Sequence, residues 1–251
     1  MRYELFVYPP YNEPLLSAFG CAYESVFVVL HPFLRVPDAL AWKTTKKYPD
    51  DSEILAHASR CPWTEVAARA GLANCSRLGH ALLTSIGALG PELADPAARD
   101  TLKEFLVAEP IWMPTEGRFE PLLQSAFLSA FEAVGHAQLV HVPEFPGVDP
   151  IRTLSVASLR SGQQTFPAGG TLAAPDASFL FSVDWESFFT LFYGPRAFVE
   201  EVARQQNLEG FFATPTTEHY WFNYVLGCAT VTVTPEVWTA ATSPDAPASA
   251  R

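Results

Sequence analysis

Paired cysteines are missing from this sequence. Cys21, Cys61, Cys75 and Cys228 are widely spaced and form no C-x-x-C motif, so the usual signatures of structural zinc and of thiol redox chemistry are absent. Isolated thiols of this kind are most often reduced, buried and packed like small hydrophobic residues. We therefore expect no essential disulfide and no bound metal.

Basic side chains are also scarce. Sixteen Lys and Arg stand against twenty-seven Asp and Glu, which gives a net charge of −11. This charge opposes binding to phosphate groups, so nucleic acid and anionic membranes are not expected as partners. The one basic cluster, Lys43 with Lys46 and Lys47, is too small to change this. A basic protein partner is the better electrostatic match.

A secretory or membrane-spanning segment is missing as well. Met1 to Tyr11 carries an early Arg, a Glu and two prolines in place of a secretory apolar region, and the apolar run Ser25–Leu30 is too short to cross a bilayer. We therefore expect a soluble protein of the cytoplasm.

Catalytic and cofactor motifs are absent too. No two histidines stand at a helical metal-binding spacing, no serine lies in a G-x-S-x-G elbow, and Gly169-Gly170 does not form a phosphate-binding loop. The segment Trp63–Leu72 resembles the start of a helix-turn-helix, but the next helix offers only Arg77 and His80 to a DNA groove, which favours two packed core helices. The sequence therefore indicates no cofactor.

Aromatic residues, by contrast, are concentrated in one segment. Fourteen of the thirty-three aromatic side chains lie between Phe179 and Tyr224. Because each buries roughly 150–250 Å², this segment must form a core, a partner-binding surface, or both.

The first half of the chain has mainly helical patterns. Ser25–Leu30 is apolar, β-branched and closed by His31-Pro32, which is typical of a buried strand. A polar stretch punctuated by prolines follows from Val36 to Asp51. Start and stop signals then predict four helices, at residues 62–71, about 74–89, 96–108 and 121–134.

Strand patterns dominate after Gly135. They predict one amphipathic helix at 196–206 and strands at residues 138–142, 178–183, 187–193, 209–213 and 228–233. Residues 151–159 are compatible with a further strand. Because Asp184-Trp185-Glu186 separates two of these runs, we expect an antiparallel hairpin there. The pattern indicates an α+β fold in which a helical N-terminal half packs with a mixed, mainly antiparallel sheet in the C-terminal half.

We expect a single α+β domain over residues 1–239, helix-rich at 1–135 and sheet-rich at 136–239. The Gly/Pro/Ala-rich stretch 161–176 is expected to be a loop and makes the best internal boundary. From Ala240 onward no apolar side chain larger than Ala remains. Burial cannot offset the ordering entropy of such a tail, so residues 240–251 are expected to be disordered.

Four residues near the aromatic segment form the candidate binding site. Asp184 and Trp185 fall in the expected hairpin turn, and Glu218 and His219 follow a Thr-Pro-Thr-Thr stretch. If these two segments lie side by side, the four share one rim, and a Trp beside acids is a common anchor for a partner. Glu218 is not expected to orient His219 as a general base, because adjacent residues do not face each other.

Several short motifs resemble a bacterial family. The motifs are His31-Pro-Phe-Leu34, Tyr48-Pro-Asp50, Trp63, Leu83-Thr-Ser-Ile-Gly-Ala-Leu89, Asp184-Trp185 with Ser187, Leu208-Glu-Gly-Phe-Phe212 and Thr217-Glu218 to Trp221. These motifs are similar to those of domain of unknown function 2711. They occur in the same order and span most of residues 23–223. The resemblance implies a single bacterial domain, and it carries no activity, ligand or catalytic residue.

Two function classes remain open. The first is a binding or interaction module, such as an immunity-type or regulatory partner, in keeping with the acidic charge, the aromatic density and the lack of a catalytic constellation. The second is an unrecognised enzyme whose site is assembled from dispersed residues, among them His31, Asp184, Glu218 and His219. A deep pocket with converging histidines and carboxylates would favour the enzyme, and a broad apolar patch would favour the binding module. The sequence leaves the oligomeric state open.

Overall fold

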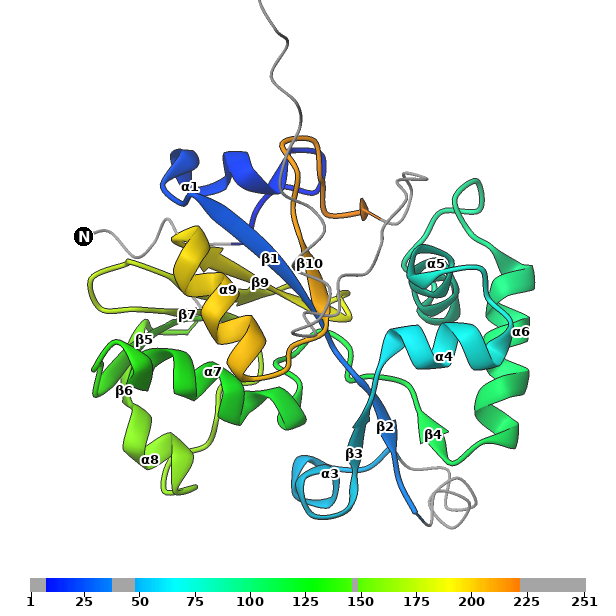
Figure 1. Cartoon of the computed structure of the whole chain (residues 1–251), viewed down its shortest axis with the longest axis horizontal. Coiled ribbons are helices and arrows are strands. Elements are labelled where there is room, and N and C mark those ends of the chain that lie inside the picture. Colours follow the sequence, from blue (N-terminus) through cyan, green and yellow to red (C-terminus); the bar gives the residue numbers. More distant parts are fainter. Residues whose placement is uncertain (1–7, 38–47, 146–148, 222–251) are drawn as a thin grey trace, which may run out of the picture.

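The computed structural model describes residues 8–37, 48–145 and 149–221. Within these ranges the fold is α+β, with most helices in the first half of the chain and most strands in the second (Figure 1), as the sequence predicts. None of the described helices is long and apolar enough to span a bilayer. The strand expected at 228–233 and the tail at 240–251 lie outside the described residues.

A seven-stranded sheet forms the centre of the fold, in the order β10-β1-β9-β8-β7-β5-β6. Its neighbouring strands are all antiparallel. The strands are β1 (Ser25–Leu30), β5 (Gln138–Val142), β6 (Arg152–Ser155), β7 (Gly170–Ala173), β8 (Leu180–Val183), β9 (Phe189–Gly194) and β10 (Gly210–Phe212). All six residues of β1 are buried, because this strand lies between β9 and β10 and brings the N-terminal half into the sheet.

Three helices cover one face of this sheet: α7 (Pro121–Ala133), α8 (Val156–Arg160) and α9 (Arg196–Gln205) (Figure 1). Phe127 and Phe131 of α7 pack against Phe181 of β8. Val199 and Val202 of α9 are buried in the same apolar cluster. The aromatic residues concentrated in the sequence therefore contribute to the core on both faces, because Phe179, Phe181 and Phe192 lie in this cluster, whereas Phe189, Tyr193 and Phe211 lie in the cluster on the other face.

A second group of helices stands beside the sheet, namely α4 (Trp63–Ala70), α5 (Cys75–Ile86) and α6 (Pro96–Ala108) (Figure 1). Asn74 caps α5 by accepting a hydrogen bond from the Arg77 N–H, and Asp95 caps α6 in the same way. These helices and the other face of the sheet form one apolar cluster. The segments η2 (Leu15–Ser17) and α1 (Ala18–Cys21) contribute Leu15 and Ala18 to the same cluster. Cys61 and Cys75 are buried free thiols.

A small sheet links the two parts, with strands β2 (Phe33–Arg35), β3 (Ser59–Cys61) and β4 (Ile111–Trp112) in the order β3-β2-β4. β2 follows β1 after only His31-Pro32. Helix α3 (Asp51–His57) precedes β3 and begins with a capping box formed by Asp50 and Glu53.

Two sequence interpretations are wrong in detail. The stretch 161–176 is not a plain loop, because it contains β7, which pairs with both β5 and β8. Residues 151–159 do not form one strand, because Ser155 caps the helix α8 through the Ser158 N–H. In both places turn-forming residues lie next to a short helix or strand, so the local sequence does not reveal it. Packing against distant segments stabilises this short element.

Candidate functional site

The β8–β9 hairpin places the candidate site at one end of the large sheet. Val183 pairs with Thr190, and the chain between them turns through Asp184, Trp185 and Glu186. The Ser187 N–H and Oγ both donate to the Asp184 carbonyl, at 3.1 and 3.0 Å. Asp184 is buried, whereas Trp185 is 56% exposed.

A neighbouring loop braces this turn from the outside. The Gly117 N–H donates to the Ser187 carbonyl at 2.9 Å. Gly117 has a φ of +66°, and a Cβ atom at this position would overlap the carbonyl oxygen of Trp185. Only glycine satisfies both conditions. The backbone that carries Trp185 is therefore held in one position.

The N-terminal segment joins Asp184 to His219. The Tyr11 hydroxyl donates to Asp184 Oδ2 at 2.7 Å, and the Tyr11 ring stacks on His219 with centroids 4.3 Å apart. The Tyr8 hydroxyl is hydrogen-bonded to His219 Nδ1 at 2.9 Å. The structure thus brings together Asp184 and His219 through Tyr11. Glu218 lies half-buried next to His219 along the chain.

Four carboxyl groups surround the turn, and they disfavour one another's charge. Burial raises the pKa of Glu116, Glu144, Asp184 and Glu186. Glu186 further raises the pKa of Glu116, and Asp184 that of Glu144 and Glu186. None of the basic side chains in the described ranges is among the groups that shift these values. We call the four acids together with Trp185 the Trp185 rim. It keeps Asp184 and Trp185 of the four residues grouped by the sequence, whereas His219 is buried against Tyr11.

Two buried histidines lie close to the rim. Burial lowers the pKa of His219 to about 3 and that of His31 to about 4. Both nitrogens of His31 are hydrogen-bonded, Nδ1 with the Thr115 carbonyl and Nε2 with Thr190 Oγ1. At neutral pH both imidazoles are therefore uncharged and enclosed in the protein.

We expect His219 to make the protein less stable in acid. The pKa of His219 is about 3 in the folded chain and about 6.5 in an unfolded chain. As the pH falls from 6.5 to 4, only the unfolded chain takes up this proton, so the free energy of unfolding decreases by an amount on the order of 3 kcal/mol. The raised pKa of Asp184 acts with the opposite sign, so the effect of His219 must be measured as a difference between variants.

That difference is given by urea unfolding of the wild type and of His219→Gln at pH 7 and pH 4. Gln preserves a hydrogen-bonding group near Tyr8 but does not titrate. Between the two pH values the wild type should lose about 2–3 kcal/mol more than the variant. If the free energy of unfolding decreases equally in the two proteins, His219 is protonated in the folded chain. His57→Gln, at an exposed position of α3, is the matched surface control.

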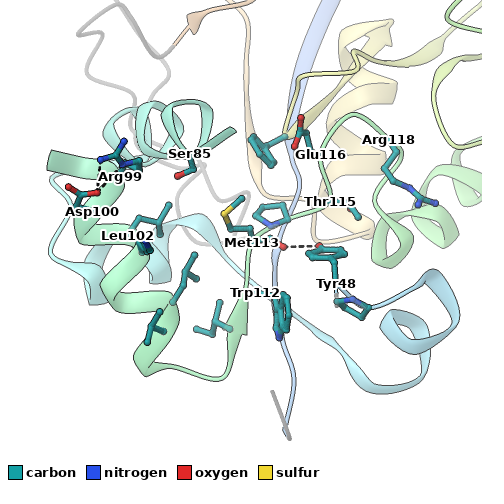
Figure 2. Close-up of a pocket in the computed structure, with 17 residues that line it drawn as sticks. Tyr48, Ser85, Arg99, Asp100, Leu102, Trp112, Met113, Thr115, Glu116 and Arg118 are labelled. Atoms are coloured by element: carbon teal, nitrogen blue, oxygen red, sulfur yellow. Dashed lines mark hydrogen bonds and ion pairs between the residues drawn. The ribbon is translucent and has the colours of Figure 1, made fainter. Parts of the chain in front are cut away.

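A cavity of about 1150 Å³ lies beside the rim, between α6 and the segment that runs from β4 to Arg118. Figure 2 shows Arg99 and Leu102 of α6 on one side, and Tyr48, Trp112 and Arg118 on the other. Glu116 borders both the cavity and the rim. The sequence interpretation missed this cavity, because the residues that line it come from five separate segments and form no local motif.

Metal-binding geometry is not found in the described part of the chain. No group of three or more His, Cys, Asp or Glu side chains among these residues is arranged to hold a metal ion.

Comparison with known proteins identifies relatives. The sequence model of a family described as "Protein of unknown function (DUF2711)" matches residues 11–223. The chain is also 22% identical over 218 residues to the "Uncharacterized protein YwbB" of Bacillus subtilis (strain 168), an alignment that covers 84% of this chain and 96% of that protein. No solved structure matches the chain. The motif resemblance seen in the sequence is thereby confirmed.

Proposed function

The chain belongs to the DUF2711 family, and from this premise we propose that it is a binding module that docks a basic segment of a protein partner on the Trp185 rim. The observation that carries the proposal is the exposure of Trp185, at 56%, on a braced turn. Exposed Trp side chains are frequent anchors of protein interfaces. A rigid turn loses little conformational entropy on binding, which favours affinity.

The charge of the rim selects the kind of partner. Its acids raise one another's pKa, so a cation placed among them would relieve this repulsion. Arg and Lys form charge-assisted hydrogen bonds with carboxylates, and Arg also stacks on the face of a Trp ring. The net charge of −11 would speed the approach of a basic segment.

A second aromatic side chain extends the surface. Phe145 is 64% exposed and directly follows Glu144, whose pKa is raised by burial and by Asp184 of the turn. A partner that covers the rim therefore has two aromatic contacts available. This combination of apolar anchors and acids is the pattern of a partner surface.

The alternative function, an enzyme that uses His31, Asp184, Glu218 and His219, has less support. An effective general base has a pKa near the working pH and reaches the substrate. His31 and His219 have pKa values of about 4 and about 3, and both are buried. Their hydrogen bonds to Thr190 and Tyr8 are those of side chains packed in a core.

The proposal is tested by partner capture from the native host, followed by affinity measurement with the purified partner. Trp185→Ala should weaken binding by about 30-fold or more, as expected for an interface hot spot, and should leave the melting temperature unchanged. Glu186→Lys should weaken binding and reduce its dependence on salt.

Glu201→Lys is the matched control, because it makes the same charge change on α9, where Glu201 forms an exposed ion pair with Arg204. It should bind nearly as well as the wild type. A Trp185→Ala protein with wild-type affinity, or equal losses in the two Lys variants, would count against the rim.

A further inference from the structure

The cavity beside α6 has the size and form of a small-molecule site. Its volume of about 1150 Å³ is somewhat above the roughly 300–1,000 Å³ that is usual for ligand pockets. One wall is α6, and the opposite wall is made by Tyr48, β4 and the residues that follow it (Figure 2). Apart from Glu116, the cavity and the Trp185 rim share no residues.

The cavity has an apolar interior. Leu102, Ile111 and Phe188 line it and are almost fully buried. Val107, near the end of α6, also lines it and is 66% exposed. An apolar group that enters the cavity would contact these side chains and displace water from them, so the interior favours a ligand with an apolar body.

The charges on α6 give the cavity a positive side. Arg99 and Lys103 both line the cavity and stand one helical turn apart, so they lie on the same face of the helix. The only acid of α6 that lines the cavity is Asp100, which pairs with Arg99 at 2.8 Å. The two side chains are 41% and 59% exposed, so the pair is weak and Arg99 can also bind a ligand. Of the described residues, none forms an ion pair with Lys103.

The other charged residues that line the cavity do not favour an anion, so an anionic group would bind at the α6 side. Arg118 pairs with Asp51 at 2.5 Å, more closely than Arg99 with Asp100, and it also lowers the pKa of the buried Glu120, so two carboxylates compensate its charge. Glu116 borders the cavity away from α6 and lies close to Glu186. It would repel an anionic group, so the preferred orientation puts the anionic group at Arg99 and Lys103 and the apolar body toward Met113 and Phe188.

From these features we infer that the cavity binds an amphipathic organic anion, in which one carboxylate or similar acidic group is attached to an apolar body. Neither an imidazole nor a thiol is among the described residues that line it, which fits binding without covalent chemistry. The inference is independent of the proposed partner site. It also runs against the net charge of −11, so a preference for anions can come only from local side chains.

A series of ligands with one chain length and three different head groups tests the inference. Decanoate, decanol and decyltrimethylammonium are titrated below their micelle concentrations by calorimetry, with displacement of the fluorescent anion 1-anilinonaphthalene-8-sulfonate as a second readout. Decanoate should bind at least tenfold more tightly than decyltrimethylammonium, with decanol between them. Lys103→Glu should abolish this preference, and because Lys103 is exposed, the variant should fold normally.

Arg152→Glu is the matched control, since it makes the same charge change at an exposed position of strand β6, away from the cavity. It should retain the preference for decanoate. Equal affinity for the three head groups would overturn the anion preference and leave an apolar cavity without charge selectivity. Tighter binding of the ammonium compound, or no binding of any of the three, would overturn the inference altogether. None of these ligand titrations depends on the partner-binding test with Trp185→Ala. The cavity proposal and the partner proposal can therefore be contradicted independently.

Discussion

Replacing Phe181 by Ala is expected to lower the free energy of unfolding by about 3–5 kcal/mol. Phe181 is fully buried at the centre of the large sheet. Its ring stacks on Phe192 with centroids 4.3 Å apart and packs on Phe127 of α7 at 4.6 Å. Truncation leaves a cavity that these rings cannot fill, because they are themselves held by the strands and helix on either side.

Urea unfolding of Phe181→Ala measures this loss, and Trp185→Ala is its control. The two residues are both aromatic and lie on the same hairpin, but Trp185 is more than half exposed, so its removal should change stability by less than about 0.5 kcal/mol. A Phe181→Ala protein as stable as the wild type would show that the aromatic segment does not form the core described above.

Gly117→Ala is expected to displace the Trp185 turn and to destabilise the protein by about 2–5 kcal/mol. The left-handed backbone at Gly117 costs an alanine about 1–2 kcal/mol. Overlap of the new Cβ with the Trp185 carbonyl adds a cost of about 1–3 kcal/mol, typical of overpacking. Because the clash is with the backbone of the turn itself, binding of a partner at the rim should be lost as well.

Gly87→Ala separates the two contributions. Gly87 also has a positive φ, +75°, but no atom lies within 4 Å of the position where its Cβ would stand. This variant should show only the smaller backbone cost and should keep partner binding. If Gly117→Ala and Gly87→Ala are equally stable and both bind the partner, the contact between Gly117 and Trp185 is not what positions the turn.

The elements with local signals are the ones that the sequence predicts well. Helix α6 starts and ends where expected, because Asp95 and Pro96 mark its start and Glu109-Pro110 its end. β1 is recognisable because a fully buried strand has an unbroken apolar run. The β8–β9 hairpin is found because three polar or amphipathic residues interrupt two apolar runs.

Short strands that pair with distant segments cannot be predicted from local sequence signals. β4 has two residues and β2 and β3 have three each, which is too few for a periodic pattern. β7 is surrounded by glycine and proline, and its position is set by β5 and β8 on either side. In each case pairing between segments far apart in the chain determines the structure.

The candidate site shows the same limit. Asp184 and Trp185 can be singled out because they occupy a hairpin turn, but nothing in the sequence shows that Tyr11 joins Asp184 to His219. Acids on separate loops, Glu116 and Glu144, complete the Trp185 rim. Glu116 is brought close by the packing of Gly117 against the turn, and Glu144 lies beside Gly169 and Gly170 at the start of β7, which only the folded chain reveals.

The most direct test of the proposed function is a photocrosslinking experiment in the native host. Trp185 is replaced by p-benzoylphenylalanine in one variant and Leu55 in another. Leu55 is a suitable control because it lies on α3 and is 57% exposed, much like Trp185. The proposal predicts that position 185 crosslinks to a basic segment of a specific partner and that position 55 does not. No crosslink at position 185, or the same products from both positions, would contradict it.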